Sequence, residues 1–176
     1  MVVQLRDIIG TAAKAHVDGL ISGFSCIDKD VENFLKTKAY QHEQRNKSRT
    51  YLVIANDTYK LIAYFTLSLK ALELDDGISK TVRKNVDGFN KAATSVPVIL
   101  IGQLGKDSHC SQEIRGSDLL DSCLSYVYKT HSLVGSRVVL VETAKSEKVI
   151  AFYDNNGFTV FREDPNDKLV QMIRTL

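Results

Sequence analysis

The sequence predicts a single α/β or α+β domain in which helices flank a central sheet of mixed strand direction. Residues 50–55 and 61–69 are rich in β-branched and aromatic side chains, and Asn56-Asp57 supplies turn residues between them, which predicts a hairpin. In the C-terminal half, apolar segments alternate with helical patterns, as is typical of a sheet covered by helices. No repeat or Pro/Gly-rich linker interrupts the 176 residues, so one domain is expected over residues 1–176.

Two helices are predicted before the hairpin. Residues 7–20 carry apolar side chains at loosely helical spacing. A second, amphipathic helix with a polar and basic outer face is expected from residue 27 to about residue 45. Its apolar face follows the i, i+4, i+7, i+8 pattern of Ile27, Val31, Phe34 and Leu35.

A third helix is predicted directly after the hairpin, over residues 76–93. Its apolar side chains recur at helical spacing, and its exposed side is expected to be basic. The apolar positions are Ile78, Val82, Val86 and Phe89, and the exposed positions are Lys80, Arg83 and Lys84.

The remaining elements are strands separated by helices. The nearly continuous apolar segment 96–104 predicts a central strand, and Gly102 inside it indicates a bulge or a close approach of the backbone to another group. A helix over 116–129 and a buried strand over 137–142 follow. Ser146 is placed to begin a short helix that ends near Tyr153. The last two strands are expected at 157–161 and 168–173.

Composition narrows the class of protein. The net charge of +2 does not by itself indicate nucleic-acid binding. The three cysteines show no CxxC spacing, and the four histidines share no metal-ligand spacing, so neither a disulfide framework nor a metal site is expected. The first residues lack a secretory pattern, and no apolar segment approaches the ~20 residues of a membrane span. A cytoplasmic protein with no membrane contact is therefore expected.

The loop between the central strand and the 116–129 helix is a candidate anion site. Such a loop presents backbone N–H groups and the positive end of the helix dipole, which suit a pyrophosphate. It runs Ser111-Gln-Glu-Ile-Arg-Gly-Ser117, in which Gly116 allows close approach and Arg115 or Lys106 can add charge. An ordinary loop with a solvated arginine would have the same sequence.

A second candidate lies where the short helix ends. Asn156-Gly157 is a helix stop in which glycine takes the left-handed conformation, and Tyr153 lies one turn before it. A phenol here can donate a proton to a leaving group, although a packing role would also explain it. Glu142, at the end of a buried strand, is the candidate general base, acting through water; a solvated strand-end carboxylate is the alternative.

These two features, in this order and at this separation, resemble the GNAT N-acetyltransferases. The segment Ala151-Phe-Tyr-x-x-x-Gly-Phe158 is similar to the family's closing acetyl-CoA motif. The family's phosphate loop reads Gln/Arg-x-x-Gly-x-Gly/Ala; here Gly116 matches its last position, while Ser111 and Ile114 depart from the other two. The backbone amides that hold the phosphates do not depend on these side chains.

The resemblance extends over residues 24–161. Segments 24–35, 49–53 and 62–68 are similar to a subgroup of small GNAT proteins that includes toxins of toxin–antitoxin pairs, which acetylate aminoacyl-tRNA. The resemblance implies the GNAT fold, a mixed and mostly antiparallel central sheet flanked by helices. It also implies acetyl-CoA as the acyl donor.

The resemblance further implies roles for individual residues. Backbone groups of Gln103, Leu104 and Gly105 would bind the pantetheine arm and polarise the acetyl carbonyl. Tyr153 would contact the cofactor and protonate the departing thiolate after direct attack by the amine. The residues expected to hold the pyrophosphate are Ser111, Ile114, Arg115, Gly116 and Ser117.

The acceptor amine is left open among a metabolite, a protein and an aminoacyl-tRNA, and a homodimer is a further expected arrangement. The alternative function is a catalytically weak GNAT-like domain that binds acyl-CoA or a partner. Basic residues crowd the second helix and its exit, where the resemblance implies contact with tRNA phosphates and a solvated helix face is the other explanation. They are Lys36, Lys38, Arg45, Lys47 and Arg49.

Overall fold

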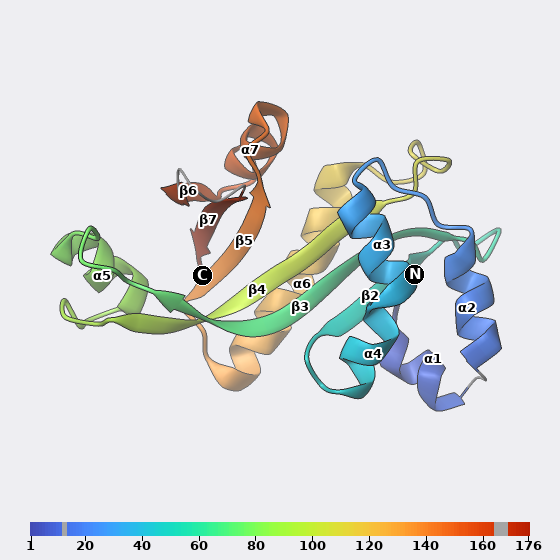
Figure 1. Cartoon of the computed structure of the whole chain (residues 1–176), viewed down its shortest axis with the longest axis horizontal. Coiled ribbons are helices and arrows are strands. Elements are labelled where there is room, and N and C mark those ends of the chain that lie inside the picture. The colour runs from blue at the N-terminus through green and yellow to red at the C-terminus, as the bar shows by residue number, and fades with distance from the viewer. Residues whose placement is uncertain (12–13, 164–168) are drawn as a thin grey trace. The chain divides into compact units, whose positions relative to one another are not determined.

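The computed structural model describes residues 1–11, 14–163 and 169–176, and Figure 1 shows its helices and strands. The strands are β1 (Val2–Gln4), β2 (Arg49–Ile54), β3 (Leu61–Glu73), β4 (Ser95–Lys106), β5 (Val138–Ala144), β6 (Thr159–Glu163) and β7 (Leu169–Thr175). The helices are α1 (Leu5–Thr11), α2 (Lys14–Ser22), α3 (Lys29–Thr37), α4 (Ala39–Gln44), α5 (Lys80–Asp87), α6 (Gly116–Val134) and α7 (Glu147–Asp154).

The strands are hydrogen-bonded in the order β1-β2-β3-β4-β5-β7-β6. The pairs β1–β2, β2–β3, β5–β7 and β6–β7 are antiparallel, whereas β4 and β5 are parallel. The predicted hairpin and the mixed, mostly antiparallel sheet are therefore confirmed. The described residues divide into two compact units, Met1–Ser68 with Gly102–Ser125 and Leu69–Ile101 with Tyr126–Leu176.

In the first unit, helices α1 to α4 pack an apolar core against β2 and β3 (Figure 1). One buried carboxylate, that of Glu43 on α4, fixes the start of β2. It accepts a hydrogen bond from the backbone N–H of Thr50 at 2.8 Å and forms an ion pair with Arg49 at 2.9 Å. Because both oxygens are paired, the charge can be buried at this junction.

The second unit has its own core, to which β3, β4, β5, β7 and α5 contribute. Its most unusual core residue is Arg83 of α5, which is only 8% exposed. The guanidinium has five N–H donors and here satisfies carbonyl oxygens of the chain on both sides of α5. The acceptors are the carbonyls of Leu74, Asp75, Ile78 and Ala93.

The predicted exposed face of α5 is wrong at Arg83 for this reason. Arg83 was expected on the exposed face, but its hydrogen bonds to main-chain carbonyls draw it inside. The helix is also shorter than predicted, because Ser79 caps it and Gly88, with φ +113°, ends it. Phe89 therefore lies beyond the helix and is 83% exposed.

The expected long helix over 27–45 is wrong as well. The side chain of Asp28 accepts hydrogen bonds from Asp30 N and Val31 N, so the helix begins after it and leaves Ile27 92% exposed. A break at Lys38 separates α3 from α4. The helix predicted over 7–20 corresponds to α1 and α2, and the strand β1 was not predicted. Lys168, expected in the last strand, lies outside the described residues.

We expect replacement of Arg83 by methionine to lower the free energy of unfolding by about 2–4 kcal/mol, because several buried carbonyls lose their donor. Chemical denaturation measures this. Lys84→Met, on the exposed side of the same helix, is the matched control and should change stability by no more than about 0.5 kcal/mol. Equal stability of the two variants would contradict the role assigned to Arg83.

Candidate active site

The expected anion site lies in the first unit, between the end of β4 at Lys106 and the start of α6 at Gly116. The N–H of Leu119 donates to the carbonyl of Arg115 in the first turn of α6. The N–H groups of residues 116–118 precede it, at the positive end of a 19-residue helix. Gly116 and Ser117 are half-buried. This end of α6 therefore has the backbone geometry of an anion site.

Lys106 organises the loop that leads to this helix. Its ammonium donates to the carbonyl oxygens of Ser111 at 2.9 Å and Ile114 at 3.0 Å. In a trans peptide the N–H points away from the C=O, so the N–H groups of Gln112 and Arg115 are turned away from the lysine. The lysine thus acts on the loop backbone.

Arg115 is paired inside the loop. Its guanidinium donates to both oxygens of Asp118, at 3.0 and 2.9 Å. The hydrogen bond to Asp118 raises the pKa of Arg115, and the same contact lowers the pKa of the Asp118 carboxyl. The pair is neutral as a whole, so the site offers an anion backbone dipoles in place of a free guanidinium.

The end of β4 is packed more closely than an ordinary strand. A Cβ at Gly105 would lie 2.4 Å from Val31 Cγ1, and a Cβ at Gly102 would lie 3.1 Å from Thr66 Oγ1. The predicted close approach at Gly102 is confirmed, and the tighter one at Gly105 was not foreseen. Gln103 and Leu104 between them are half-buried. The backbone of this segment is held in place on both sides by neighbouring side chains.

Tyr153 lies in the second unit, on α7, and is 8% exposed. Its ring packs edge-on against Phe152 and Phe158, with ring centres 5.1 and 5.4 Å away. Its carbonyl accepts from the N–H of Phe158, and Gly157 has φ +80°, so the predicted left-handed helix stop is confirmed. Ser146 precedes α7 as predicted, although its hydroxyl makes no capping hydrogen bond.

Glu142, on β5 of the same unit, is engaged by two neighbouring strands. Its carboxylate accepts from Lys70 Nζ of β3 at 2.7 and 2.6 Å and from Gln171 Nε2 of β7 at 2.8 Å. It is therefore neither the solvated strand-end carboxylate of the alternative nor an acceptor with unused oxygens. No signal in the sequence links Lys70 to Glu142, which lies 72 residues away.

The five basic residues expected to contact tRNA separate into two groups. Lys36 pairs with Glu32, and Arg49 pairs with Glu43. The others are exposed and make no ion pair within the described part of the chain. Burial lowers the pKa of His42, and the positive charges of three cations lower it further. We call these three the basic cluster: Lys38, Arg45 and Lys47.

The structure thus distributes the expected site residues over both units. Residues 103–105 and 111–117 belong to the first unit, and Glu142 and Tyr153 to the second. Among the described residues, no group of His, Cys, Asp or Glu side chains is arranged to hold a metal ion. None of the helices in that same part of the chain is long and apolar enough to cross a membrane.

Comparison with solved structures decides the fold. A Tyr-to-Phe mutant of KacT superposes with a TM-score of 0.72 at 24% identity, over 97% of this chain and 92% of that one. AtaT complexed with acetyl-methionyl-tRNAfMet gives 0.66 at 22% identity, over 86% and 85%. These neighbours are GNAT-fold acetyltransferase toxins.

The chain has the GNAT fold. A third neighbour, a Tyr-to-Phe mutant of AtaT bound to the C-terminus of the antitoxin AtaR and acetyl-CoA, gives a TM-score of 0.71 at 20% identity, over 99% of this chain and 92% of that one. No protein-family model matches the sequence. The GNAT fold and the likeness to the toxin subgroup, both expected from the motifs, are therefore confirmed.

We expect Gly105→Ala to lower the free energy of unfolding by about 1–3 kcal/mol, because the added methyl group meets Val31. The double variant Gly105→Ala, Val31→Ala should recover part of the loss caused by this overlap. Gly10→Ala is the control, since a Cβ there would have no contact within 4 Å from another described segment, and a helical alanine should raise stability by roughly 0.5–1 kcal/mol. Denaturant unfolding that shows Gly105→Ala as stable as the parent would contradict the packing argument.

Proposed function

We propose that the chain is an acetyl-CoA-dependent N-acetyltransferase whose acceptor is the amino group of an aminoacyl-tRNA. The observation that carries the proposal is the start of α6, where Lys106 holds the carbonyls of Ser111 and Ile114 and the N–H groups of the same peptides point away from it, in a chain with the GNAT fold. Neighbours of the same fold have been captured with acetyl-CoA and with acetyl-methionyl-tRNAfMet, which supports both the donor and the acceptor class.

In this proposal the donor is held mainly by backbone groups. The amides of the loop and the first turn of α6 bind the pyrophosphate, with contributions from Ser111, Ile114, Arg115, Gly116 and Ser117. The backbone of Gln103, Leu104 and Gly105 binds the pantetheine arm and stabilises the oxyanion. Acetyl-CoA supplies the activated acyl carbonyl. The departures at Ser111 and Ile114 are compatible with this, because peptide N–H groups and not side chains provide the donors.

The proposed chemistry needs one acid and one proton acceptor. A neutral amine attacks the carbonyl, the C–S bond breaks, and Tyr153 donates its phenolic proton to the departing sulfur. The Tyr-to-Phe mutants of both KacT and AtaT among the neighbours support testing this tyrosine. Glu142, whose carboxylate also accepts from Lys70 and Gln171, is the proposed proton acceptor, acting through water.

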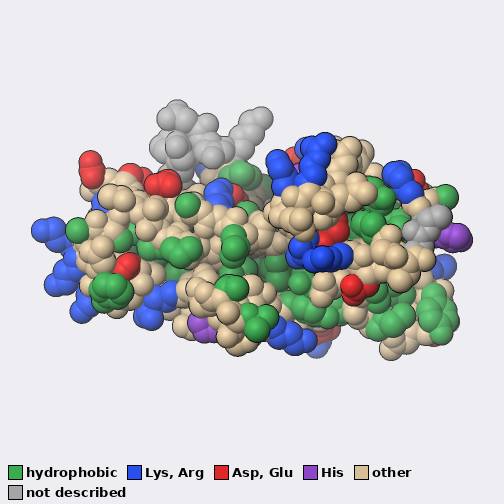
Figure 2. All heavy atoms as spheres, turned by 90° about the horizontal axis from the view of Figure 1, so that it is seen from below, with side chains coloured by type: hydrophobic (Ala, Val, Ile, Leu, Met, Phe, Trp, Pro, Cys, Tyr) green, Lys and Arg blue, Asp and Glu red, His purple; other side chains and the backbone are tan. Residues whose placement is uncertain are grey.

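The basic cluster on α4 and its exit is proposed to contact tRNA phosphates. Its three cations have no carboxylate partner among the described residues, which distinguishes them from Lys36 and Arg49. A second exposed basic group, Lys80, Lys84 and Lys91, lies in the second unit, and Figure 2 shows basic side chains around the segment that carries α5. The charges of the first group lower the pKa of His42.

We expect Tyr153→Phe to lower kcat by about 10²–10⁴-fold while acetyl-CoA affinity is unchanged, because the ring packing is kept and only the proton donor is lost. Calorimetric titration and a steady-state assay with aminoacyl-tRNA measure the two quantities. Glu142→Gln keeps the hydrogen-bonding shape and removes the base, so a similar loss there would support Glu142 as proton acceptor. Acetyl-CoA binding without turnover by the parent protein would favour the alternative, a binding domain.

We expect the triple variant Lys38→Gln, Arg45→Gln, Lys47→Gln to weaken tRNA binding and to reduce the slope of log K against log salt by about 2–3, since each phosphate contact contributes roughly 0.7–0.9. The matched control is Lys14→Gln, Lys29→Gln, Lys36→Gln, which removes the same charge from lysines that are ion-paired. Identical salt slopes for the two triple variants would show that bulk charge, and not the cluster, binds the RNA.

A further inference from the structure

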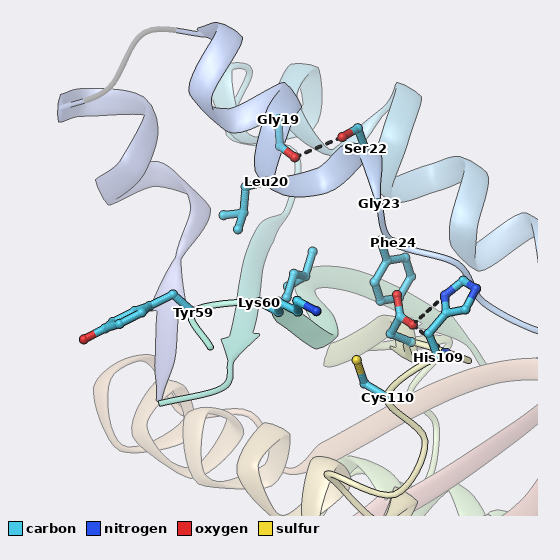
Figure 3. A pocket seen from close by; sticks show the side chains of 11 residues that line it. Gly19, Leu20, Ser22, Gly23, Phe24, Tyr59, Lys60, His109 and Cys110 are labelled. Carbon is cyan, nitrogen blue, oxygen red and sulfur yellow. Dashed lines mark hydrogen bonds and ion pairs between the residues drawn. The ribbon is translucent and has the colours of Figure 1, made fainter. Parts of the chain in front are cut away.

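A pocket of about 470 Å³ in the first unit has no role in the function proposed above. It lies between the end of α2, the start of β3 and the loop after β4 (Figure 3). Leu20 and Phe24 form apolar walls, and Lys60, His109 and Cys110 provide polar groups. Its volume falls within the range of pockets that bind small ligands.

The polar end of the pocket is built on a buried carboxylate. Asp107 is 3% exposed and accepts from the backbone N–H groups of Ser25 at 2.9 Å and His109 at 2.7 Å. Its Oδ1 also lies 3.2 Å from His109 Nδ1, as Figure 3 shows. Since a carboxylate only accepts, Nδ1 carries the proton, and the ring is oriented with Nε2 as its outer nitrogen. The chain itself satisfies Asp107, which therefore fixes His109 in place.

Lys60 supplies a positive charge at the centre of the pocket. Figure 3 places it between Leu20 on one side and Phe24 and His109 on the other. Lys60 and Cys110 both line the pocket. Burial and the neighbouring Glu113 raise the pKa of the Cys110 thiol, and the charge of Lys60 opposes that rise. Lys60 is exposed and has no ion pair with any residue of the described ranges. The pocket is thus suited to an anionic group.

An exposed aromatic ring stands at the rim. Tyr59 is 69% exposed and has φ +55°, a left-handed conformation that is unfavourable for a bulky side chain and natural for Gly or Asn. Strained backbone of this kind at a pocket is a reason to look for function. A flat, solvated ring beside a cationic pocket is the arrangement on which proteins stack unpaired nucleotide bases.

We propose that this pocket binds the terminal unpaired nucleotide of an RNA strand, with its phosphate on Lys60 and its base stacked on Tyr59. This rests on the proposed function, because it assigns a place to the single-stranded end of the RNA acceptor. The apolar walls of Leu20 and Phe24 line the remainder of the site. CoA also contains a nucleoside phosphate, so the experiment has to distinguish binding of an RNA end from binding of CoA.

The probe is the trinucleotide CCA carrying a 5′-phosphate, titrated into the full chain with and without saturating CoA. We expect Tyr59→Asn to weaken binding by about 10-fold or more and Tyr59→Phe by less than about 3-fold, because only the first removes the stacking surface. Tyr59→Asn should at the same time raise the thermal midpoint, since Asn tolerates the left-handed conformation; a drop in affinity in a more stable protein cannot come from misfolding. Lys60→Gln should weaken binding by about 5-fold or more.

Two results would overturn the proposal. One is trinucleotide affinity that does not change in Tyr59→Asn and Lys60→Gln. The other is complete displacement of the trinucleotide by CoA, which would give the pocket to the cofactor. Acetyl-CoA affinity of the parent protein and of the same variants is measured in parallel. A parent protein that does not bind acetyl-CoA would contradict the proposed acetyltransfer, whereas trinucleotide binding tests the pocket alone.

Discussion

The close contact between the end of β4 and the start of α3 is the constraint on which the first unit depends. Gly105 has no side chain because Val31 occupies the space beside it, and the hydroxyl of Tyr64 donates to the carbonyl of that same residue. Two hydrogen bonds join Ser25 to the residues that follow β4, at Asp107 and Ser108. Together these contacts fix the point from which the loop to α6 and the pocket beside Lys60 both extend.

The two candidate features, the backbone site at the start of α6 and the side chain of Tyr153, are held in place by different contacts. The anion site of the first unit uses backbone groups that Lys106 arranges, so side-chain changes in the loop leave its donors in place. The candidate acid of the second unit, Tyr153, depends instead on aromatic packing and on the helix stop at Gly157. A loop can therefore depart from the GNAT sequence pattern while the helix that carries the tyrosine keeps it.

Local patterns predicted the elements whose residues interact with near neighbours in the sequence. The hairpin, the strand β4, the helix α6 and the stop at Gly157 all follow from spacing or turn chemistry. Errors arose where a distant partner decides the outcome. Arg83 is inside because it binds carbonyls of other segments, and Glu142 is paired because Lys70 of another strand reaches it. Such contacts leave no periodic signal, so the position of the loop between β4 and α6 was predictable, whereas the pairing of Glu142 was not.

The pairing of Arg115 with Asp118 has a consequence for how the protein would respond to ionic strength. A neutral pair leaves the start of α6 to attract phosphate through short-range peptide dipoles, which dissolved ions screen little once the ligand is seated. The unpaired cations around His42 act over longer distances and are screened strongly. In the proposed function, binding of acetyl-CoA would therefore depend little on salt, whereas binding of tRNA would weaken as the salt concentration rises.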